Sequence, residues 1–416
     1  MAIFFSDIDK DLIRPSVGRD PLGLHPIWTT RARDIVPHLT AQTSRIEGFQ
    51  VLLTIYALWT QFQEANDLSD KQLEQFYLLT EQVIARSSYV INGVWPLPGR
   101  RRLLAGDSKL IVSLSDHNFH LSQNQLSSGT WGLYRGAAER AGLLDIANRR
   151  IAAPYLKAAA PLPASIVQKL FKVIKEALSA PEAQIPIYGG KKGELAVAMA
   201  QLVERPPLIS LLRDPLLFPT NNPLTGELAT ILANKTDWDY RPLIAQLIER
   251  LPGHRETLNH LLSCEQWLAP VEGIFDWLCA HSGFSLHEAA LKLPVDLFVL
   301  RRFRTAFLDS GNYDGKAASR QNLYAGLDLT DKASLISSLL AAHKAVAEEK
   351  EAGPWIAFDE NERLDVRVSM DAPNKGELDP ATAWRNDYYL SAFWRISRQV
   401  IKGIRDEGDS SDDQDS

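Results

Sequence analysis

The chain of 416 residues contains only two cysteines and three methionines. Two cysteines are too few for the disulfide framework that stabilises small secreted domains, so we expect a protein of the reducing cytoplasm. Its first ten residues already include Asp7 and Asp9, which are out of place in a charged-then-apolar secretion leader. The most apolar stretch, residues 48–62, is shorter than the roughly 20 residues that a membrane-spanning helix needs. We therefore expect no association with a membrane.

Complete catalytic signatures are also missing. The chain has no Gly-X-Ser-X-Gly elbow and no dinucleotide fingerprint, and its loop around Lys191 and Lys192 lacks the Walker spacing. Asp359, Asp365 and Arg367 imitate the order of charges in a metal-dependent nuclease, but arginine cannot replace the lysine because its charge is fixed. The sequence identifies no reaction. We expect a protein that is not an enzyme and has no cofactor, although an enzyme of unrecognised type stays open.

The cysteines and two histidines have a spacing that invites a metal interpretation. His260 and Cys264 are four residues apart on an expected helix, and Cys279 and His281 lie close together further along. Both cysteines, however, stand among Leu and Trp, where a free cysteine usually serves as a small buried hydrophobe. We expect no metal site here.

Charge is distributed unevenly along the chain. The totals are 45 Lys and Arg against 51 Asp and Glu, a net charge of −6. Residues 86–192 hold 15 bases and 6 acids, a net charge of +9, whereas the flanking residues 1–85 and 193–405 carry −4 and −5. The last eleven residues, 406–416, contain six acids and no base. One basic block thus lies between acidic flanks.

The basic block predicts contact with duplex DNA, because Lys and Arg that replace condensed counterions gain affinity without reading sequence. The candidate nucleic-acid-binding residues are Arg100, Arg101, Arg102, Arg135, Arg140, Arg149, Arg150, Lys191 and Lys192. The alternative is that basic clusters such as Lys169, Lys172 and Lys175 are merely the solvated face of an amphipathic helix.

Hydrophobic periodicity predicts a mainly α, multi-domain helical protein with a winged-helix-like basic module and a small C-terminal β-hairpin. The expected regions are an N-terminal helical domain (1–85), the basic winged-helix-like domain (86–192), a helical array (193–350), a β-hairpin with an aromatic helix (351–405) and a disordered acidic tail (406–416). In the basic domain the order is a short helix after residue 130, a strand pair around residues 146–156 and a helix from about residue 164.

Two local expectations concern the ends of the folded part. The Pro- and Gly-rich opening, residues 13–30, predicts an ordered loop that packs Leu22, Leu24, Ile27 and Trp28 onto the core. Later, one helix is expected from Val51 and another from Ser69. The last helix, residues 381–404, is expected to carry an aromatic stripe that either packs in the core or anchors a partner protein. The candidate partner-binding residues are Trp384, Tyr388, Phe393 and Trp394.

Three short stretches, residues 18–40, 131–145 and 384–394, resemble features of poorly characterised helical proteins encoded in bacterial phage-defence and restriction loci. None of the three is a catalytic motif. The resemblance implies a cytoplasmic accessory subunit of a multi-gene antiviral complex. Its protein partners would be a nuclease, helicase or ATPase encoded nearby.

Two functional hypotheses follow. The first is a non-enzymatic subunit that brings such a complex to DNA through the basic block. The second is a scaffold that holds protein partners and does not bind nucleic acid directly. The acidic tail adds a further hypothesis, because a tethered polyanion competes with nucleic acid for a basic surface.

Overall fold

The computed structural model describes residues 20–66, 72–105, 109–145, 150–159, 162–204, 208–311 and 313–403. Helix accounts for 65% of the structure and strand for 4%, which confirms the mainly α class. The chain divides into two compact units. Unit 1 combines Met1–Ile35 with Asp237–Tyr388, and unit 2 combines Val36–Thr236 with Tyr389–Ser416. The division into five sequence regions stays a prediction.

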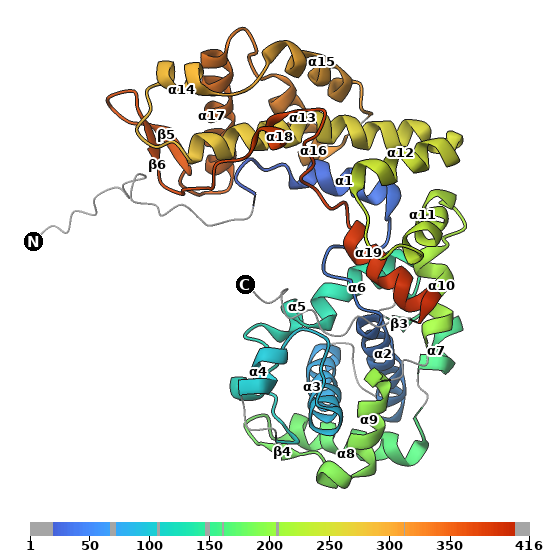
Figure 1. Ribbon diagram of the computed structural model, residues 1–416. Helices are drawn as coiled ribbons and strands as arrows, with labels where there is room; N and C mark the ends of the chain where they lie inside the picture. Colours follow the sequence, from blue (N-terminus) through green and yellow to red (C-terminus); the bar gives the residue numbers. More distant parts are fainter. Residues whose placement is uncertain are drawn as a thin grey trace, which may run out of the picture. The chain divides into compact units, whose positions relative to one another are not determined.

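Unit 1 is built around one long buried helix, α13, which contacts α1, α12, α15 and α18 (Figure 1). Its leucine, tryptophan and phenylalanine side chains are excluded from solvent on most sides of the helix. The helices of this unit are α1 (His25–Ile35), α12 (Tyr240–Arg250), η5 (Pro252–His254), α13 (Arg255–Cys279), α14 (Leu286–Lys292), α15 (Leu297–Leu308), α16 (Gly315–Ala325), α17 (Lys332–Glu349) and α18 (Lys375–Leu378).

The expected C-terminal hairpin is confirmed in unit 1. Strands β5 (Ile356–Phe358) and β6 (Leu364–Val366) pair antiparallel, with Ile356 opposite Val366. The turn is closed by Asp359, whose carboxylate accepts hydrogen bonds from the backbone N–H groups of Asn361 and Arg363 at 2.8 and 2.9 Å. Asp359 therefore has a structural role in the turn.

The N-terminal segment differs from the expected loop, because α1 begins at His25. The Asp20 carboxylate accepts hydrogen bonds from the backbone N–H groups of Leu24 and His25, at 2.7 and 3.2 Å, and so satisfies donors at the start of the helix. Pro26 is tolerated because the first turn needs no donor at that position. The expected burial is confirmed. Buried apolar residues here are Leu22, Leu24, Ile27 and Trp28.

Unit 2 packs shorter helices around the apolar pair α2 and α3, and α9 lies along α3. Its helices are α2 (Ile46–Asn66), α3 (Leu73–Asn92), α4 (Arg100–Ala105), η3 (His117–Phe119), α5 (Gln125–Ser128), α6 (Thr130–Arg140), α7 (Ala153–Ala159), α8 (Ala164–Ser179), η4 (Gly190–Lys192), α9 (Glu194–Glu204), α10 (Ile209–Leu217), α11 (Pro223–Ala233), α19 (Leu390–Ser397) and η6 (Arg398–Lys402). The expected helix start at Ser69 lies outside the described residues.

Two short antiparallel strand pairs belong to unit 2. They are β1 (Ile111–Val112) with β4 (Ile185–Pro186), and β2 (Leu144–Asp145) with β3 (Arg150–Ile151). The second pair lies after the short helix α6, but it begins two residues before the expected range of 146–156, and the end of that range belongs to α7. The order α6, β2, β3 and α8 follows the expectation, but α7 lies between the hairpin and α8.

The last helix is shorter than expected. It begins at Leu390, since Tyr388 and Tyr389 adopt positive φ angles of 50° and 62° that interrupt any helix through them. Trp384 and Tyr388 consequently belong to unit 1, while Phe393 and Trp394 belong to unit 2. The expectation of one aromatic stripe on a single helix is wrong.

Among the described residues, one helical stretch, Glu194–Leu217, has the length and apolar character to span a membrane. About half of its most apolar window, 53%, is buried inside the protein. The stretch comprises α9 and α10. Core helices meet the same criterion, so it gives no argument for a membrane span.

Candidate functional site

The predicted DNA-binding residues are spread over four elements of unit 2. Those that the structure describes lie on α4 (Arg100, Arg101 and Arg102), on α6 (Arg135 and Arg140), on β3 (Arg150) and on η4 (Lys191 and Lys192), whereas Arg149 lies outside the described residues. Helix α4 and the β2–β3 hairpin lie on opposite sides of the α2–α3 pair (Figure 1). The eight residues that the structure describes therefore do not share one face.

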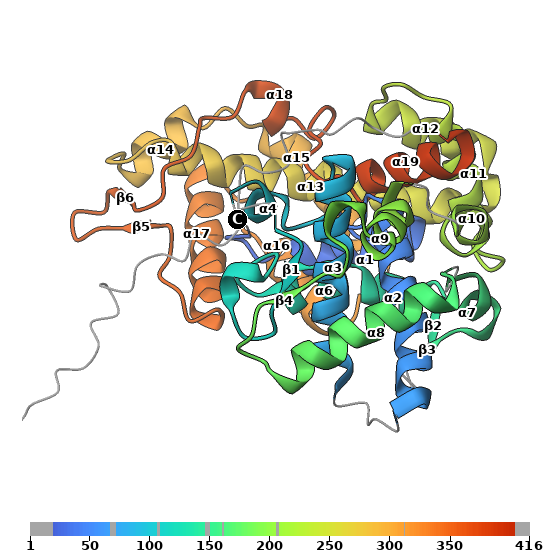
Figure 2. The same cartoon turned by 90° about the horizontal axis from the view of Figure 1, so that it is seen from below.

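One further lysine lies close to the approach to η4. The β1–β4 ladder places Leu110 against Ile187, whose N–H donates to the Leu110 carbonyl at 2.7 Å, so the chain around Lys109 lies beside the segment that leads into η4. Figure 2 shows β1 and β4 side by side. We define the α4–η4 basic surface as the exposed side chains of Arg100, Arg101, Arg102, Lys109, Lys191 and Lys192.

A buried arginine supports this surface from below. The Arg86 guanidinium donates to the carbonyl oxygens of Lys109 and Phe119, at 3.4 and 2.9 Å. Burial lowers the pKa of Arg86 to about 10, which still leaves it charged at neutral pH. Arg102 donates to the carbonyl of His117 at 2.9 Å and thereby fixes α4 to the η3 turn. The surface thus rests on a rigid polar framework.

The α6 arginines are engaged within the protein. Arg135 forms an ion pair with Glu139 at 3.0 Å and lies over the Trp131 ring at 5.2 Å. Arg140 donates to the carbonyl of His38 at 3.0 Å. These contacts hold both side chains against unit 2, as the contact with His117 holds Arg102.

The lysines of α8 also have internal partners. Lys169 forms an ion pair with Glu194, and Lys172 lies over the Tyr188 ring at 4.7 Å from its centre. The solvated-face interpretation therefore describes these lysines only in part.

Unit 1 contains a buried acidic cluster that the sequence analysis missed. Glu265, Glu272 and Asp276 follow one face of α13, at spacings of seven and four residues. Burial raises the pKa of Glu265 to about 7 and also raises the pKa of Glu272. Arg385 is the counter-charge, since it forms ion pairs with Asp276 and, at 3.6 Å, with Glu377.

Carboxylates with raised pKa values are candidates for acid–base chemistry. The geometry of Glu265 favours a structural role, because its two oxygens accept hydrogen bonds from the backbone N–H groups of Arg385 and Asn386, at 2.9 and 3.2 Å. Glu265 thereby anchors the extended segment that precedes the positive φ angles at Tyr388 and Tyr389. The signal for this cluster in the sequence was the helical spacing of three acids within an otherwise apolar helix.

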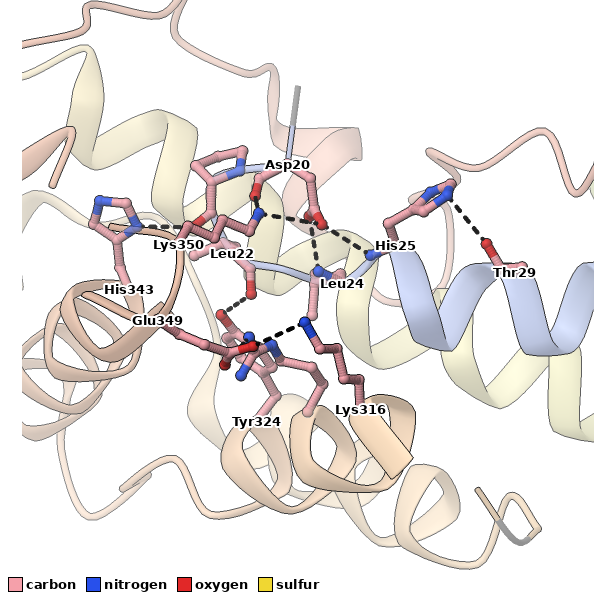
Figure 3. Close-up of polar contacts among 12 residues, drawn as sticks. Asp20, Leu22, Leu24, His25, Thr29, Lys316, Tyr324, His343, Glu349 and Lys350 are labelled. Atoms are coloured by element: carbon pink, nitrogen blue, oxygen red, sulfur yellow. Dashed lines mark hydrogen bonds and ion pairs between the residues drawn. The ribbon is translucent and has the colours of Figure 1, made fainter. Parts of the chain in front are cut away.

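A second polar network in unit 1 joins the start of the described chain to α17 and to the segment that follows it (Figure 3). Lys350 donates to the carbonyl of Asp20 and lies 3.7 Å from its carboxylate. His343 accepts the Trp355 N–H through Nε2 at 2.8 Å, which requires Nδ1 to carry the proton that it shares with the Pro21 carbonyl at 3.0 Å. Burial lowers the pKa of His343, so this neutral form is maintained.

The cysteines are buried and separated along α13. The Cys264 thiol lies 2.8 Å from the Tyr313 hydroxyl, and burial raises the pKa of each thiol to about 12, so neither is reactive. Within the described ranges, no group of three or more His, Cys, Asp or Glu side chains is arranged to hold a metal ion.

One cavity of about 510 Å³ lies in unit 1 beside the start of α17. Its two carboxylates already serve the backbone, because Asp328 accepts the Thr330 N–H and Asp331 accepts the Ser334 N–H, both at 2.8 Å. Both of its carboxylates are thus already used in local structure.

No protein family, curated protein or solved structure that was compared matches the chain.

Proposed function

We propose that the protein is a non-enzymatic DNA-contacting subunit and that the α4–η4 basic surface is its contact. The observation that carries the proposal is the exposure of six cations on unit 2, among which the β1–β4 ladder brings the chain around Lys109 beside the segment that leads into η4. Phosphate contacts of this kind position a protein on a duplex without reading bases. The resemblance to defence-locus proteins supports a setting in a bacterial antiviral or restriction complex.

The winged-helix interpretation is the finer part of this proposal. It is supported by the order of α6, the β2–β3 hairpin and α8. In a winged helix, the second helix enters the major groove and the hairpin contacts the backbone. Arg150 on β3 is exposed and suits such a backbone contact.

The test is a titration of fluorescent duplex DNA at two salt concentrations. The Arg100→Ala, Arg101→Ala, Arg102→Ala triple variant should lower affinity, and it should reduce the slope of log affinity against log salt by about two to three, because each lost phosphate contact removes roughly one unit. The matched control replaces three exposed cations of unit 1, Arg33, Arg302 and Lys344, with Ala. Equal loss in both variants would reduce the effect to net charge and would remove the α4–η4 assignment.

The alternative function is a protein scaffold, and a specific observation favours it. Leu291 on α14 and Phe298 on α15 are 76% and 78% exposed in unit 1. Large apolar side chains left this open are typical of protein contact surfaces. The scaffold function would be favoured by two results together. The α4 triple variant would still bind a protein encoded by a neighbouring gene, and a Leu291→Ser, Phe298→Ser variant would no longer bind it.

A further inference from the structure

Unit 2 has a cationic cavity at the end of α11. Its volume is about 250 Å³, and it is formed where α11 meets η6. The lining residues are Ala233, Asn234, Lys235, Thr236, Arg398 and Lys402. Half of them are positively charged, and no Asp or Glu of the described chain lines it. Two segments more than 150 residues apart in sequence thus bring three cations around one cavity.

The backbone of η6 presents two of these cations together. This segment is a π-helix, and the N–H of Gly403 donates to the carbonyl of Arg398 in the corresponding i→i+5 pattern. The wide turn places Arg398 and Lys402 on the same face. Gln399, between them, is buried and accepts the backbone N–H of Ile46 at 2.9 Å, which fixes η6 to the start of α2. Single π turns of this kind are rare and frequent at functional sites.

Trp394 organises the cavity from the side of α19. Its indole Nε1–H donates to the carbonyl of Lys235 at 3.0 Å, and the Arg398 guanidinium lies 4.9 Å from the centre of its ring. One side chain therefore positions groups from both halves of the cavity. Such positioning lowers the entropy that a ligand would otherwise have to spend in ordering them.

The end of α11 would ordinarily repel an anion, because the last carbonyls of a helix are unsatisfied and carry negative partial charge. Here these carbonyls have donors. The N–H groups of Asn234 and Lys235 donate to the carbonyls of Ile231 and Leu232, at 3.2 and 3.0 Å, and the Asn234 amide donates to the Thr230 carbonyl at 2.8 Å. The obstacle to anion binding is thereby reduced.

We infer that this cavity binds a phosphomonoester group. A doubly charged anion matches three cations better than a carboxylate does, and a guanidinium donates to two phosphate oxygens at once. The Thr236 hydroxyl and the Asn234 amide supply polar groups beside them. The volume lies just below the range of about 300–1,000 Å³ typical of sites for drug-sized ligands, so it suits a phosphate with a small attached group. Helices α19 and α11 lie away from α4, so this site is independent of the α4–η4 basic surface (Figure 1).

The experiment titrates the full chain with orthophosphate, adenosine monophosphate and adenosine, followed by calorimetry and by ³¹P line broadening. The two phosphate probes should bind saturably at one site, and adenosine should not bind. A Lys235→Ala, Lys402→Ala variant should weaken both at least ten-fold, since charge-assisted hydrogen bonds are involved. The control variant, Arg302→Ala, Lys344→Ala, carries the same charge change in unit 1 and should bind normally.

Two results would overturn the assignment: equal weakening in the control variant, or adenosine binding as tightly as its monophosphate. A Trp394→Phe variant separates loss of the site from loss of the fold, because it keeps all three cations and removes the indole donor to the Lys235 carbonyl. It should weaken phosphate binding about three-fold, while the urea unfolding midpoint changes little. A final arm compares 5′-phosphorylated with 5′-hydroxyl oligonucleotides. Preference for the phosphorylated end would identify a nucleic-acid end as the source, and equal binding would identify a small phosphorylated compound.

Discussion

The two units are both helical but place their charged side chains differently. In unit 1 the notable charges are inside, where Glu265 and Arg385 join α13 to the segment that follows α18. In unit 2, which also buries Glu81 and Arg86, the charges of the candidate binding sites lie toward the surface, on α4, η4 and η6. A buried charge is expensive unless paired, so its position reports on the fold. An exposed cation changes the free energy of folding little, so its position is more informative about a ligand than about the fold.

This contrast explains why perturbed pKa values and candidate binding surfaces occur in different places. The carboxyls with the most raised pKa values are Glu265 and Glu272 in unit 1, and both are raised mainly by burial. In unit 2, Glu81 is the comparable group, and burial raises its pKa as well. It accepts the Thr130 N–H at 2.8 Å and so holds the start of α6. In both units the buried acids position backbone.

The largest effect that would test this contrast is expected from Arg385→Ala. The substitution leaves Asp276 and Glu377 without their counter-charge. Removing one partner of a buried pair costs about 3–5 kcal/mol, and we expect about 2–3 kcal/mol because Arg385 and Asp276 retain some exposure, at 23% and 15%. The measurement is the urea unfolding midpoint.

The matched control for that substitution is Arg363→Ala. Arg363 pairs with Glu288 at 3.6 Å, but their side chains are 53% and 46% exposed, so the loss should stay below about 1 kcal/mol. Similar losses in the two variants would show that the charges around α13 are no more structural than ordinary surface pairs.

How much of the fold can be predicted from the sequence depends on how far apart along the chain the interacting residues are. Hydrophobic periodicity is local, and it predicted the helices between residues 193 and 350, the Ile356–Val366 hairpin and the apolar face of α8. The start of α1 was missed because Asp20 satisfies its donors from outside the helix. The start of α19 was missed because the segment before it is held by Glu265, more than 100 residues away.

The candidate sites show the same limit. Charge counting selected the basic residues of α4 and η4, but it could not predict the β1–β4 ladder, which brings the chain around Lys109 beside the segment that leads into η4. It also could not predict the contacts that Arg135 and Arg140 make within unit 2, because such contacts cannot be read from composition. The cavity around Lys235, Arg398 and Lys402 has no sequence motif, because its halves come from distant segments. Trp394 was selected as a possible aromatic anchor for a partner protein. In the structure its indole contacts the Lys235 carbonyl and the Arg398 guanidinium within unit 2.

An effect of comparable size is expected from Glu265→Gln, measured as stability against pH. The pKa of Glu265 is about 7 in the folded protein, against an ordinary value of 4.5, so the folded state binds its proton more tightly than the unfolded state. Stability from this group is therefore present at low pH and is lost as pH rises from about 5 to 8, by an amount on the order of 3 kcal/mol at most. The Gln variant cannot ionise and should lose less stability over this range.

Glu288→Gln provides the opposite sign for comparison. Hydrogen bonds from Ser285 lower the pKa of Glu288, so its contribution is present above pH 4.5 and is lost as the solution becomes more acidic. Thermal unfolding between pH 4 and 8 distinguishes the two variants. Identical pH profiles for the wild type and the Glu265 variant would mean that Glu265 does not titrate in this range.

The smallest effect concerns the acidic end of the chain and bears on the exposed charges of unit 2. Residues 406–416 carry six acids and no base, and a polyanion tethered near a basic surface competes with DNA at high effective concentration. Ending the chain after Arg405 should tighten DNA binding about two- to five-fold at low salt, and the gain should shrink once the Debye length falls below about 10 Å. A tail that only keeps the protein soluble would leave the two affinities equal at low salt. The informative comparison is therefore the same truncation in the wild type and in the Arg100→Ala, Arg101→Ala, Arg102→Ala variant. If the tail competes with DNA at the α4–η4 basic surface, truncation should no longer tighten DNA binding in the triple variant. If the tail acts only through overall charge, truncation should tighten binding in both proteins.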